Sequence, residues 1–174
     1  ETKTMKIKPA KEGSVDYGGA IYSEETSKAG TAQPNADGTV TMYSYGTMTY
    51  NLLRSYLYSG LDKDSTPVQL ALGWISKNYA VHKVPGYRDP EQYEMGLYYY
   101  LVSMSRTLNA MGVDLVEEPD RGLKYNWRAD LVAELKSRQA DDGSWLNTGH
   151  DRWQENSSVL CTAYALDALR HTQK

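Results

Sequence analysis

Residues 128–145 read RADLVAELKSRQADDGSW, and this stretch indicates how the chain folds. Leu131 and Leu135 lie one helical turn apart, so one face of the predicted helix is apolar and must pack against other elements. Charged side chains fill the opposite face, as on the solvent side of an outer helix. The Asp-Asp-Gly sequence that follows predicts a tight turn, because Gly tolerates a positive φ and Asp bonds to its own backbone.

Three residues around this turn form a predicted structural motif: Gln139, Gly143 and Trp145. We expect Trp145 to be mostly buried against the C-terminal end of the helix that ends near Gln139. The Gln139 amide is expected to bond to backbone groups of the turn, since aromatic and amide groups at helix ends usually satisfy packing and hydrogen bonds. The motif therefore predicts a staple at a helix end.

The composition of the 174-residue chain is compatible with one domain and a sizeable core. The 19 Lys and Arg residues against 22 Asp and Glu give a formal charge of −3 without a basic stripe, so no nucleic-acid partner is expected. No apolar run approaches ~20 residues, so no transmembrane segment is predicted. The 15 Tyr and 4 Trp, without any Phe, favour a semi-polar lining or interface.

The sequence begins at Glu1 and shows no signal peptide, so we expect a processed or truncated piece of a longer chain. Cys161 is the single cysteine, which excludes an internal disulfide bond. A soluble protein is expected, and its compartment, including export, is left open.

Two regions are predicted along the chain. Residues 1–45 are an irregular lead-in and loop with short strands at most, and residues 46–174 form a helical-hairpin repeat domain. The third and fifth predicted helices are apolar on both faces and are expected to be inner helices, whereas the second and fourth have one polar face and are expected to be outer helices. The helical period places the five helices at about 47–59, 67–79, 91–111, 126–139 and 158–171.

Four segments carry a family resemblance: YGTMTY at 45–50, GLYYY at 96–100, QADDGSW at 139–145 and LCTAYAL at 160–166. The stretch 128–145, which contains the third segment, resembles the QW repeat of squalene and oxidosqualene cyclases, which protein prenyltransferase β-subunits share more loosely. The four segments look most like the squalene-cyclase-like repeat proteins of bacteria. The resemblance implies an all-α fold, a partial α/α toroid of alternating inner and outer helices. Five helices make about half of such a toroid, so the resemblance also implies a missing half or a second copy as partner.

The acid chemistry of those cyclases is not visible in the chain. Cyclases of this kind protonate their substrate with an Asp-rich motif. Here Asp62, Asp64, Asp141 and Asp142 all fall in predicted turns, where carboxylates cap the backbone or face solvent. Glu134 also stands where the repeat has an aromatic residue. No catalytic residue is assigned.

The zinc chemistry of the prenyltransferases is not visible either. Those enzymes bind zinc through an Asp-x-Cys pair, whereas Val159 stands two residues before Cys161. His82, His150 and His171 have no metal-ligand spacing among themselves. The sequence therefore predicts no metal and no cofactor.

Five tyrosines are candidate lining residues of a ligand cavity: Tyr50, Tyr93, Tyr98, Tyr99 and Tyr100. Their rings are suited to stabilise a cation or to stack on a sugar. The alternative is core packing, because aromatic stripes on helices with two apolar faces usually pack.

The loop 150–155, which reads HDRWQE, is a second candidate. A carbohydrate-active toroid enzyme would use carboxylates, His or Arg in such a loop. The alternative is that Glu155 complements the dipole of the last helix.

Three functions stay open at this point. The first is a repeat domain that binds an apolar or sugar ligand, or a protein surface, without catalysis of its own. The second is a fragment of an isoprenoid cyclase or transferase whose catalytic residues lie in a missing N-terminal half. The third is a carbohydrate-active α/α toroid enzyme. A fold alone does not decide among them, because one scaffold hosts many activities.

Overall fold

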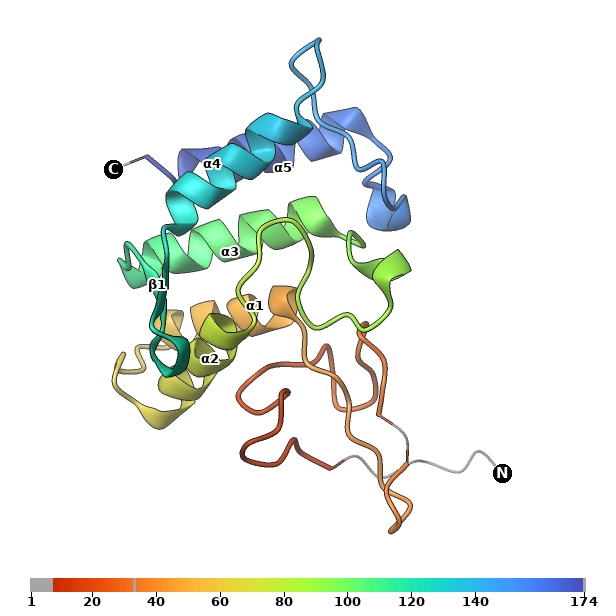
Figure 1. Cartoon of the computed structure of the whole chain (residues 1–174), viewed down its shortest axis with the longest axis vertical. Helices are drawn as coiled ribbons and strands as arrows, with labels where there is room; N and C mark the ends of the chain where they lie inside the picture. The colour runs from red at the N-terminus through yellow and green to blue at the C-terminus, as the bar shows by residue number, and fades with distance from the viewer. Residues whose placement is uncertain (1–7, 33, 174) are drawn as a thin grey trace.

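A computed structural model describes residues 8–32 and 34–173 of the protein, which form a mostly helical fold (Figure 1). The α-helices of the described residues are α1 (Gly46–Tyr58), α2 (Thr66–Lys77), α3 (Leu97–Met111), α4 (Trp127–Arg138) and α5 (Ser158–Arg170). Three-residue 3-10 helices lie at Pro90–Gln92, Pro119–Arg121 and Arg152–Gln154. The prediction of five helices is confirmed, and their bounds agree to within one turn except at the start of α3.

Three helices form a row in which α3 packs between α1 and α5 (Figure 1). Of the other two helices, α2 packs against α1, and α4 packs against both α3 and α5. Leu101, Met104 and Leu108 of α3 are fully buried at the centre of the hydrophobic core. The expectation that the third helix is buried on both sides is therefore confirmed.

The last helix does not meet the same expectation. Only Cys161, Ala165 and Ala168 of α5 are buried, whereas Val159 and Leu166 are 81% and 56% exposed. α5 packs mainly against α3 and α4, and Val159 and Leu166 lie one above the other on a face that these two helices leave exposed. The apolar character of this helix was correctly recognised, but its predicted burial on both sides is wrong.

The third helix begins later than predicted because Gly96 interrupts it. Gly96 has φ +73°, a left-handed conformation that an α-helix does not contain and that Gly adopts without strain. The residues before it form the separate 3-10 helix Pro90–Gln92 and a turn. A Cβ atom at position 96 would also lie 2.7 Å from the ring of Trp153, so packing as well as backbone geometry requires Gly here.

A small antiparallel sheet departs from the all-α prediction. β1 (Val116–Glu118) pairs with β2 (Leu123–Tyr125), and Gly122 at φ +65° closes the hairpin between them. β1 lies against α2. Strands of three residues are too short to show the alternation by which strands are recognised in a sequence, which is why the hairpin was not predicted.

The helix-end staple is formed as predicted. Trp145 is 4% exposed, and its indole N–H donates a hydrogen bond of 2.7 Å to the carbonyl oxygen of Leu135. The Gln139 amide donates to the carbonyl oxygen of Gly143 at 2.9 Å, and Gly143 has φ +84°. The buried position of Trp145 against the end of α4 is thus confirmed.

The described part of the N-terminal segment contains no helix before α1. Its regular structure consists of two isolated bridges, Ser23 with Thr26 and Thr31 with Met42. Asp16 joins the segment to the loop between α2 and α3: its carboxylate accepts from the backbone N–H of Ser44 at 2.8 Å and from Arg88 of that loop at 3.2 Å. The segment therefore packs as part of the same folded body.

Candidate functional site

A pocket of 430 Å³ lies where the N-terminal ends of α1 and α3 meet the loop before α5. We call it the aromatic pocket, because five of its lining residues are Tyr22, Tyr45, Tyr99, Trp153 and Tyr164. The other lining residues are Lys28, Thr47, Met48, Asn51, Gly96 and Glu155. The rings come from five separate parts of the chain, so the pocket exists only in the folded protein.

The wall formed by α1 depends on Gly46. A Cβ atom at this position would lie 2.7 Å from the ring of Tyr100 and 2.8 Å from the ring of Pro85. The N–H of Gly46 also donates to the carbonyl oxygen of Pro85 at 2.8 Å. The absent side chain lets the first turn of α1 approach α3 closely, and this approach places Tyr45 and Thr47 at the pocket.

The opposite wall is built from exposed rings. Tyr99 is 42% exposed, and its ring pairs with that of Tyr164 at a centroid distance of 5.8 Å. Trp153 is 44% exposed and packs on the backbone of Gly96. Trp153 and Gln154 have φ values of 58° and 64°, which residues other than Gly rarely adopt. Backbone strain of this kind is concentrated at functional sites in proteins.

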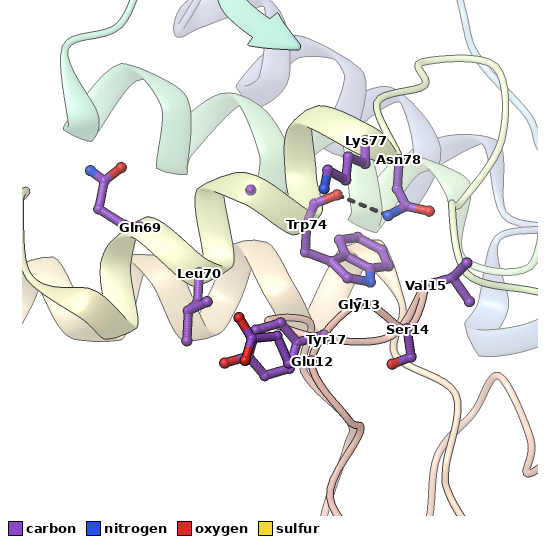
Figure 2. A pocket seen from close by; sticks show the side chains of 11 residues that line it. Glu12, Gly13, Ser14, Val15, Tyr17, Gln69, Leu70, Trp74, Lys77 and Asn78 are labelled. Carbon is purple, nitrogen blue, oxygen red and sulfur yellow. Dashed lines mark hydrogen bonds between the residues drawn. The ribbon is translucent and has the colours of Figure 1, made fainter. Parts of the chain in front are cut away.

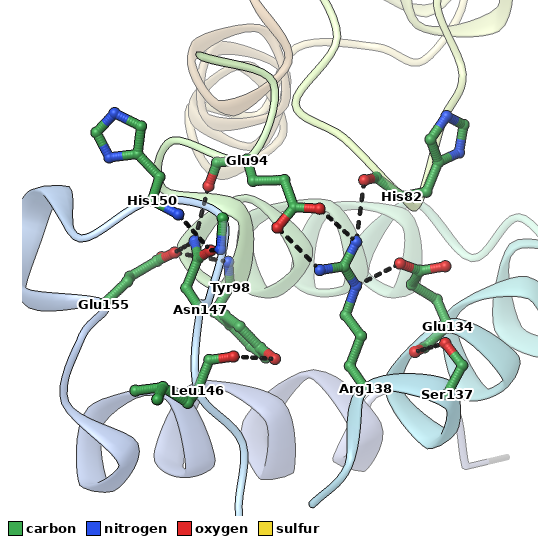
Figure 3. A network of polar contacts seen from close by, with 11 residues as sticks. His82, Glu94, Tyr98, Glu134, Ser137, Arg138, Leu146, Asn147, His150 and Glu155 are labelled. Carbon is green, nitrogen blue, oxygen red and sulfur yellow. Dashed lines mark hydrogen bonds and ion pairs between the residues drawn. The ribbon is translucent and has the colours of Figure 1, made fainter. Parts of the chain in front are cut away.

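Glu155 supplies the carboxylate of the pocket lining, and its oxygens are already bonded (Figure 3). One oxygen accepts from the backbone N–H of Tyr99 at 3.0 Å, and the other accepts from Tyr98 N–H at 3.3 Å and from the Asn147 amide at 2.7 Å. The side chain therefore caps the N-terminus of α3, where the helix dipole favours a negative charge. The prediction that Glu155 complements the dipole of the last helix, α5, is wrong, because the helix that it caps is α3.

Glu155 is only 1% exposed. Burial raises the pKa of this carboxyl above its ordinary value, while its hydrogen bonds to the N–H groups at the start of α3 and to Asn147 act in the opposite direction.

Arg138 connects the end of α4 to the segment before α3 (Figure 3). Its guanidinium group bonds both oxygens of Glu94, at 3.0 and 3.1 Å, and its Nε bonds Glu134 at 2.5 Å. Asn147 continues the network by donating to the carbonyl oxygen of Glu94 at 2.7 Å. The expectation that the charged side chains of this helix lie on a solvent face is wrong for Arg138, whose side chain is 21% exposed and bonds both Glu94 and Glu134.

Three of the five candidate tyrosines lie in the core. Tyr50, Tyr98 and Tyr100 are 1% exposed or less. The Tyr100 hydroxyl donates to the carbonyl oxygen of Ala80 at 2.7 Å, and that of Tyr98 donates to Leu146 at 3.3 Å. These three rings pack in the core, which was the alternative interpretation: α3 is covered on both sides, and the Tyr50 ring of α1 lies 5.8 Å from that of Tyr100.

The other two candidates are accessible. Tyr99 lines the aromatic pocket, as predicted for a cavity residue. Tyr93 lies outside the pocket lining, partly buried, with the ammonium of Lys83 4.5 Å from its ring centroid.

Only some of the residues that line the aromatic pocket were predicted as site candidates from the sequence. The loop 150–155 was named as a candidate, and it contributes Trp153 and Glu155. Tyr22, Tyr45 and Tyr164 were not named, because each comes from a different element and only the tertiary fold brings them together. The pair Tyr45-Gly46 was the one local indication of this pocket, because a Gly in the first turn of a helix indicates that its backbone lies close to another element.

The acidic turns are structural. The Asp142 carboxylate accepts from the backbone N–H of Ser144 at 2.9 Å, and that of Asp62 accepts from Asp64 N–H at 2.8 Å. Cys161 is fully buried and donates to the carbonyl oxygen of Glu155. Within residues 8–32 and 34–173, no group of three or more His, Cys, Asp or Glu is placed to hold a metal ion.

A second pocket, of 520 Å³, lies between residues 12–17 and α2 (Figure 2). Trp74 forms its wall and is 3% exposed. The indole N–H of Trp74 has no hydrogen-bond partner among the described residues, but it is enclosed, and a Cβ atom on Gly19 would lie 2.6 Å from it. This N–H is therefore not available to a ligand, and the aromatic pocket is the better candidate site.

Comparisons of the chain with protein-family models, with curated proteins and with solved structures find no match. A search of the described helices for one long and apolar enough to cross a membrane also finds none.

Proposed function

We propose that this protein is a repeat domain of the squalene-cyclase-like type that binds a small ligand in the aromatic pocket without catalysing a reaction on it. The observation that carries the proposal is the convergence of five aromatic rings on one pocket whose carboxylate, Glu155, is committed to capping α3. A general acid must reach a bound substrate with its proton, whereas both oxygens of Glu155 are occupied by the N–H groups of Tyr98, Tyr99 and Asn147.

Two equivalent hydrogen bonds support the repeat. The backbone N–H of Ala20 donates to the Thr49 hydroxyl at 2.9 Å, and the backbone N–H of Trp145 donates to the Thr162 hydroxyl at 3.0 Å. Each donor follows a Gly-containing turn, and each acceptor lies in a helix of the row. The same kind of hydrogen bond thus joins a Gly-containing turn to α1 and to α5, as expected if the two helices belong to equivalent repeats.

The open face of α5 supports the partial toroid. Val159 and Leu166 are apolar side chains left exposed at the end of the row. In a toroid, the next helix of the ring would cover such a face. The missing half of a toroid or a second copy of the chain are the partners that this proposal expects.

Fragment screening by ligand-observed NMR tests the binding function. We expect hits of aromatic and polyol type against the wild-type protein that disappear with Trp153→Ala. The control is Val15→Ala, because Val15 lies in the second pocket and is 64% exposed. Hits that survive Trp153→Ala and disappear with Val15→Ala would move the site to the second pocket and contradict the proposal.

The two enzyme alternatives are tested by turnover. Incubation with squalene, with prenyl diphosphates and peptide acceptors, and with oligosaccharides, each with and without zinc, is expected to give no product. Product formation that Glu155→Gln abolishes would instead show that the buried carboxyl acts as an acid.

A further inference from the structure

Two hydroxyl groups in the aromatic pocket have no partner in the protein. Tyr45 and Thr47 are 3% and 8% exposed, and neither hydroxyl makes a hydrogen bond with any residue that the structure describes. The hydroxyls of Tyr50 and Tyr87 are also unpaired, but they are sealed inside the core. Those of Tyr45 and Thr47 are not sealed, and both residues line the pocket. They are therefore free to bond to a molecule that occupies it.

Further polar groups lie beside these hydroxyls. Asn51 is one turn after Thr47 on α1 and also lines the pocket. Its amide oxygen accepts from Arg54 at 2.9 Å, which leaves the amide N–H groups without a bond to any described residue. Tyr22, Tyr45 and Tyr99 line the same pocket, and burial, together with the other two phenols, raises the pKa of Tyr45. The pocket thus combines flat rings with unpaired hydrogen-bonding groups.

An entirely apolar ligand does not fit this combination. Such a ligand would exclude water from the hydroxyls of Tyr45 and Thr47 and give them no partner, which carries the full desolvation penalty of both groups. A site that hydrogen-bonds the hydroxyls of its ligand rejects analogues that lack them for the same reason.

A cationic ligand is also disfavoured. The ammonium of Lys28 lies 4.8 Å from the ring centroid of Tyr22 at this pocket, so the site already holds one positive charge. The negative charge of Glu155 is stabilised by the start of α3 rather than left for a ligand. A second cation would meet the repulsion of Lys28 without a free carboxylate to offset it.

We propose that the aromatic pocket binds a neutral sugar, with one pyranose ring stacked on Trp153 and Tyr99 and its hydroxyl groups bonded to Tyr45 and Thr47. A sugar ring presents apolar C–H faces to aromatic side chains and hydroxyl groups at its edge, which matches both halves of the lining. The proposal rests on the proposed function, since it names the ligand class of the same pocket. Binding rather than hydrolysis is expected, because glycosidases use a pair of carboxyl groups and the lining has only that of Glu155.

A glycan microarray of neutral glucose, galactose, mannose, xylose and N-acetylglucosamine oligosaccharides tests the ligand class, followed by calorimetry with the sugar that binds best. We expect Tyr45→Phe and Thr47→Val each to weaken binding about tenfold, as for one lost hydrogen bond. Trp153→Ala is expected to abolish binding. The unfolding midpoint of Tyr45→Phe should match that of the wild type, because the lost hydroxyl has no partner within the described protein. Tyr58→Phe is the matched control, since Tyr58 is 77% exposed at the other end of α1.

Dodecanol and tetramethylammonium serve as apolar and cationic probes in the same calorimeter. Binding of either probe without binding of any sugar on the array overturns the sugar proposal and leaves the binding function standing. An affinity for dodecanol that is higher in Tyr45→Phe than in the wild type would also overturn the sugar proposal and leave the binding function standing. Sugar binding that neither Tyr45→Phe nor Trp153→Ala weakens places the sugar elsewhere and overturns the proposal. If no sugar and neither probe binds, the proposed function fails together with its ligand class.

Discussion

The carboxylate of Glu155 lies 3.0 Å from the backbone nitrogen of Tyr99, a contact that spans 56 residues of sequence. This hydrogen bond joins the loop before α5 to the first turn of α3, and both segments line the aromatic pocket. The residue that fixes the shape of the pocket is therefore also the only acid in its lining. Both oxygens of this carboxyl are occupied by donors of the protein, so neither faces the pocket free to pass a proton to a ligand.

Removal of this cap should destabilise the protein. Glu155→Ala leaves the N–H groups of Tyr98 and Tyr99 and the amide of Asn147 buried without their acceptor. We expect a loss of at least about 2 kcal/mol in the free energy of unfolding. Urea titration measures it, with Glu91→Ala as the exposed control, which should change stability by less than about 0.5 kcal/mol. Equal effects of the two substitutions would show that the cap is unimportant.

The same carboxyl predicts a pH dependence. Burial raises the pKa of Glu155 above its ordinary 4.5, so between the two values the folded protein binds more protons than the unfolded chain. Its contribution to stability is therefore fully present below pH 4.5 and decreases as the pH rises through the raised pKa. Urea titrations of the wild type and of Glu155→Gln across this range isolate the effect, because Gln does not titrate. A wild-type stability that increases relative to Glu155→Gln as the pH rises would contradict the raised pKa.

Trp145 should contribute strongly to stability. Its ring is buried against α4 and its N–H is bonded to Leu135, so Trp145→Ala is expected to lower the free energy of unfolding by about 3 kcal/mol. Trp145→Phe keeps most of the buried surface and should cost less. Denaturant titration of both variants gives the comparison, and a loss below about 0.5 kcal/mol for Trp145→Ala would show that the staple contributes nothing.

Gly96 should tolerate no side chain. Gly96→Ala forces a Cβ atom into the ring of Trp153 and places a non-Gly residue at φ +73°, so we expect a loss of about 1 kcal/mol or more and a shifted Trp emission spectrum. The matched control is Gly73→Ala in α2, where a Cβ atom meets nothing within 4 Å. This control is expected to stabilise the protein by up to about 1 kcal/mol, because Ala is the better helix former. Stabilisation by both substitutions would contradict the contact between Gly96 and Trp153.

Replacing Arg138 by another cationic residue should lower the stability of the protein. Arg138→Lys keeps the charge but loses the paired hydrogen bonds to Glu94, so we expect a loss of about 1 kcal/mol, as for a partly exposed ion pair with good geometry. A double-mutant cycle with Glu94→Gln measures the coupling between the two side chains. A coupling energy of zero would mean that the network is a surface feature only.

Local features of the fold were predictable from the sequence and long-range ones were not. The turn from Gln139 to Trp145 depends on residues close together in the chain, and its geometry was predicted correctly. The start of α3 was misplaced because apolar spacing continues across Gly96, whose conformation depends on Trp153 far along the sequence.

The candidate site shows the same division. A stripe of tyrosines on one helix indicates burial but not which ring remains accessible, and only Tyr99 among Tyr98–Tyr100 reaches the pocket. Tyr45 and Trp153 meet there because α1 and the loop before α5 both pack on α3. The spacing of residues along the sequence does not show that Tyr45 and Trp153 lie close together.

The most direct test of the central claim is a ¹H–¹⁵N correlation spectrum of the protein titrated with the oligosaccharide that binds best on the array. We expect the largest shifts on the indole N–H of Trp153 and on the backbone N–H groups of Thr47, Gly96 and Tyr99. Signals of the second pocket, such as the indole N–H of Trp74, should not move. Shifts centred on Trp74, or no shifts at saturating sugar, would contradict the account.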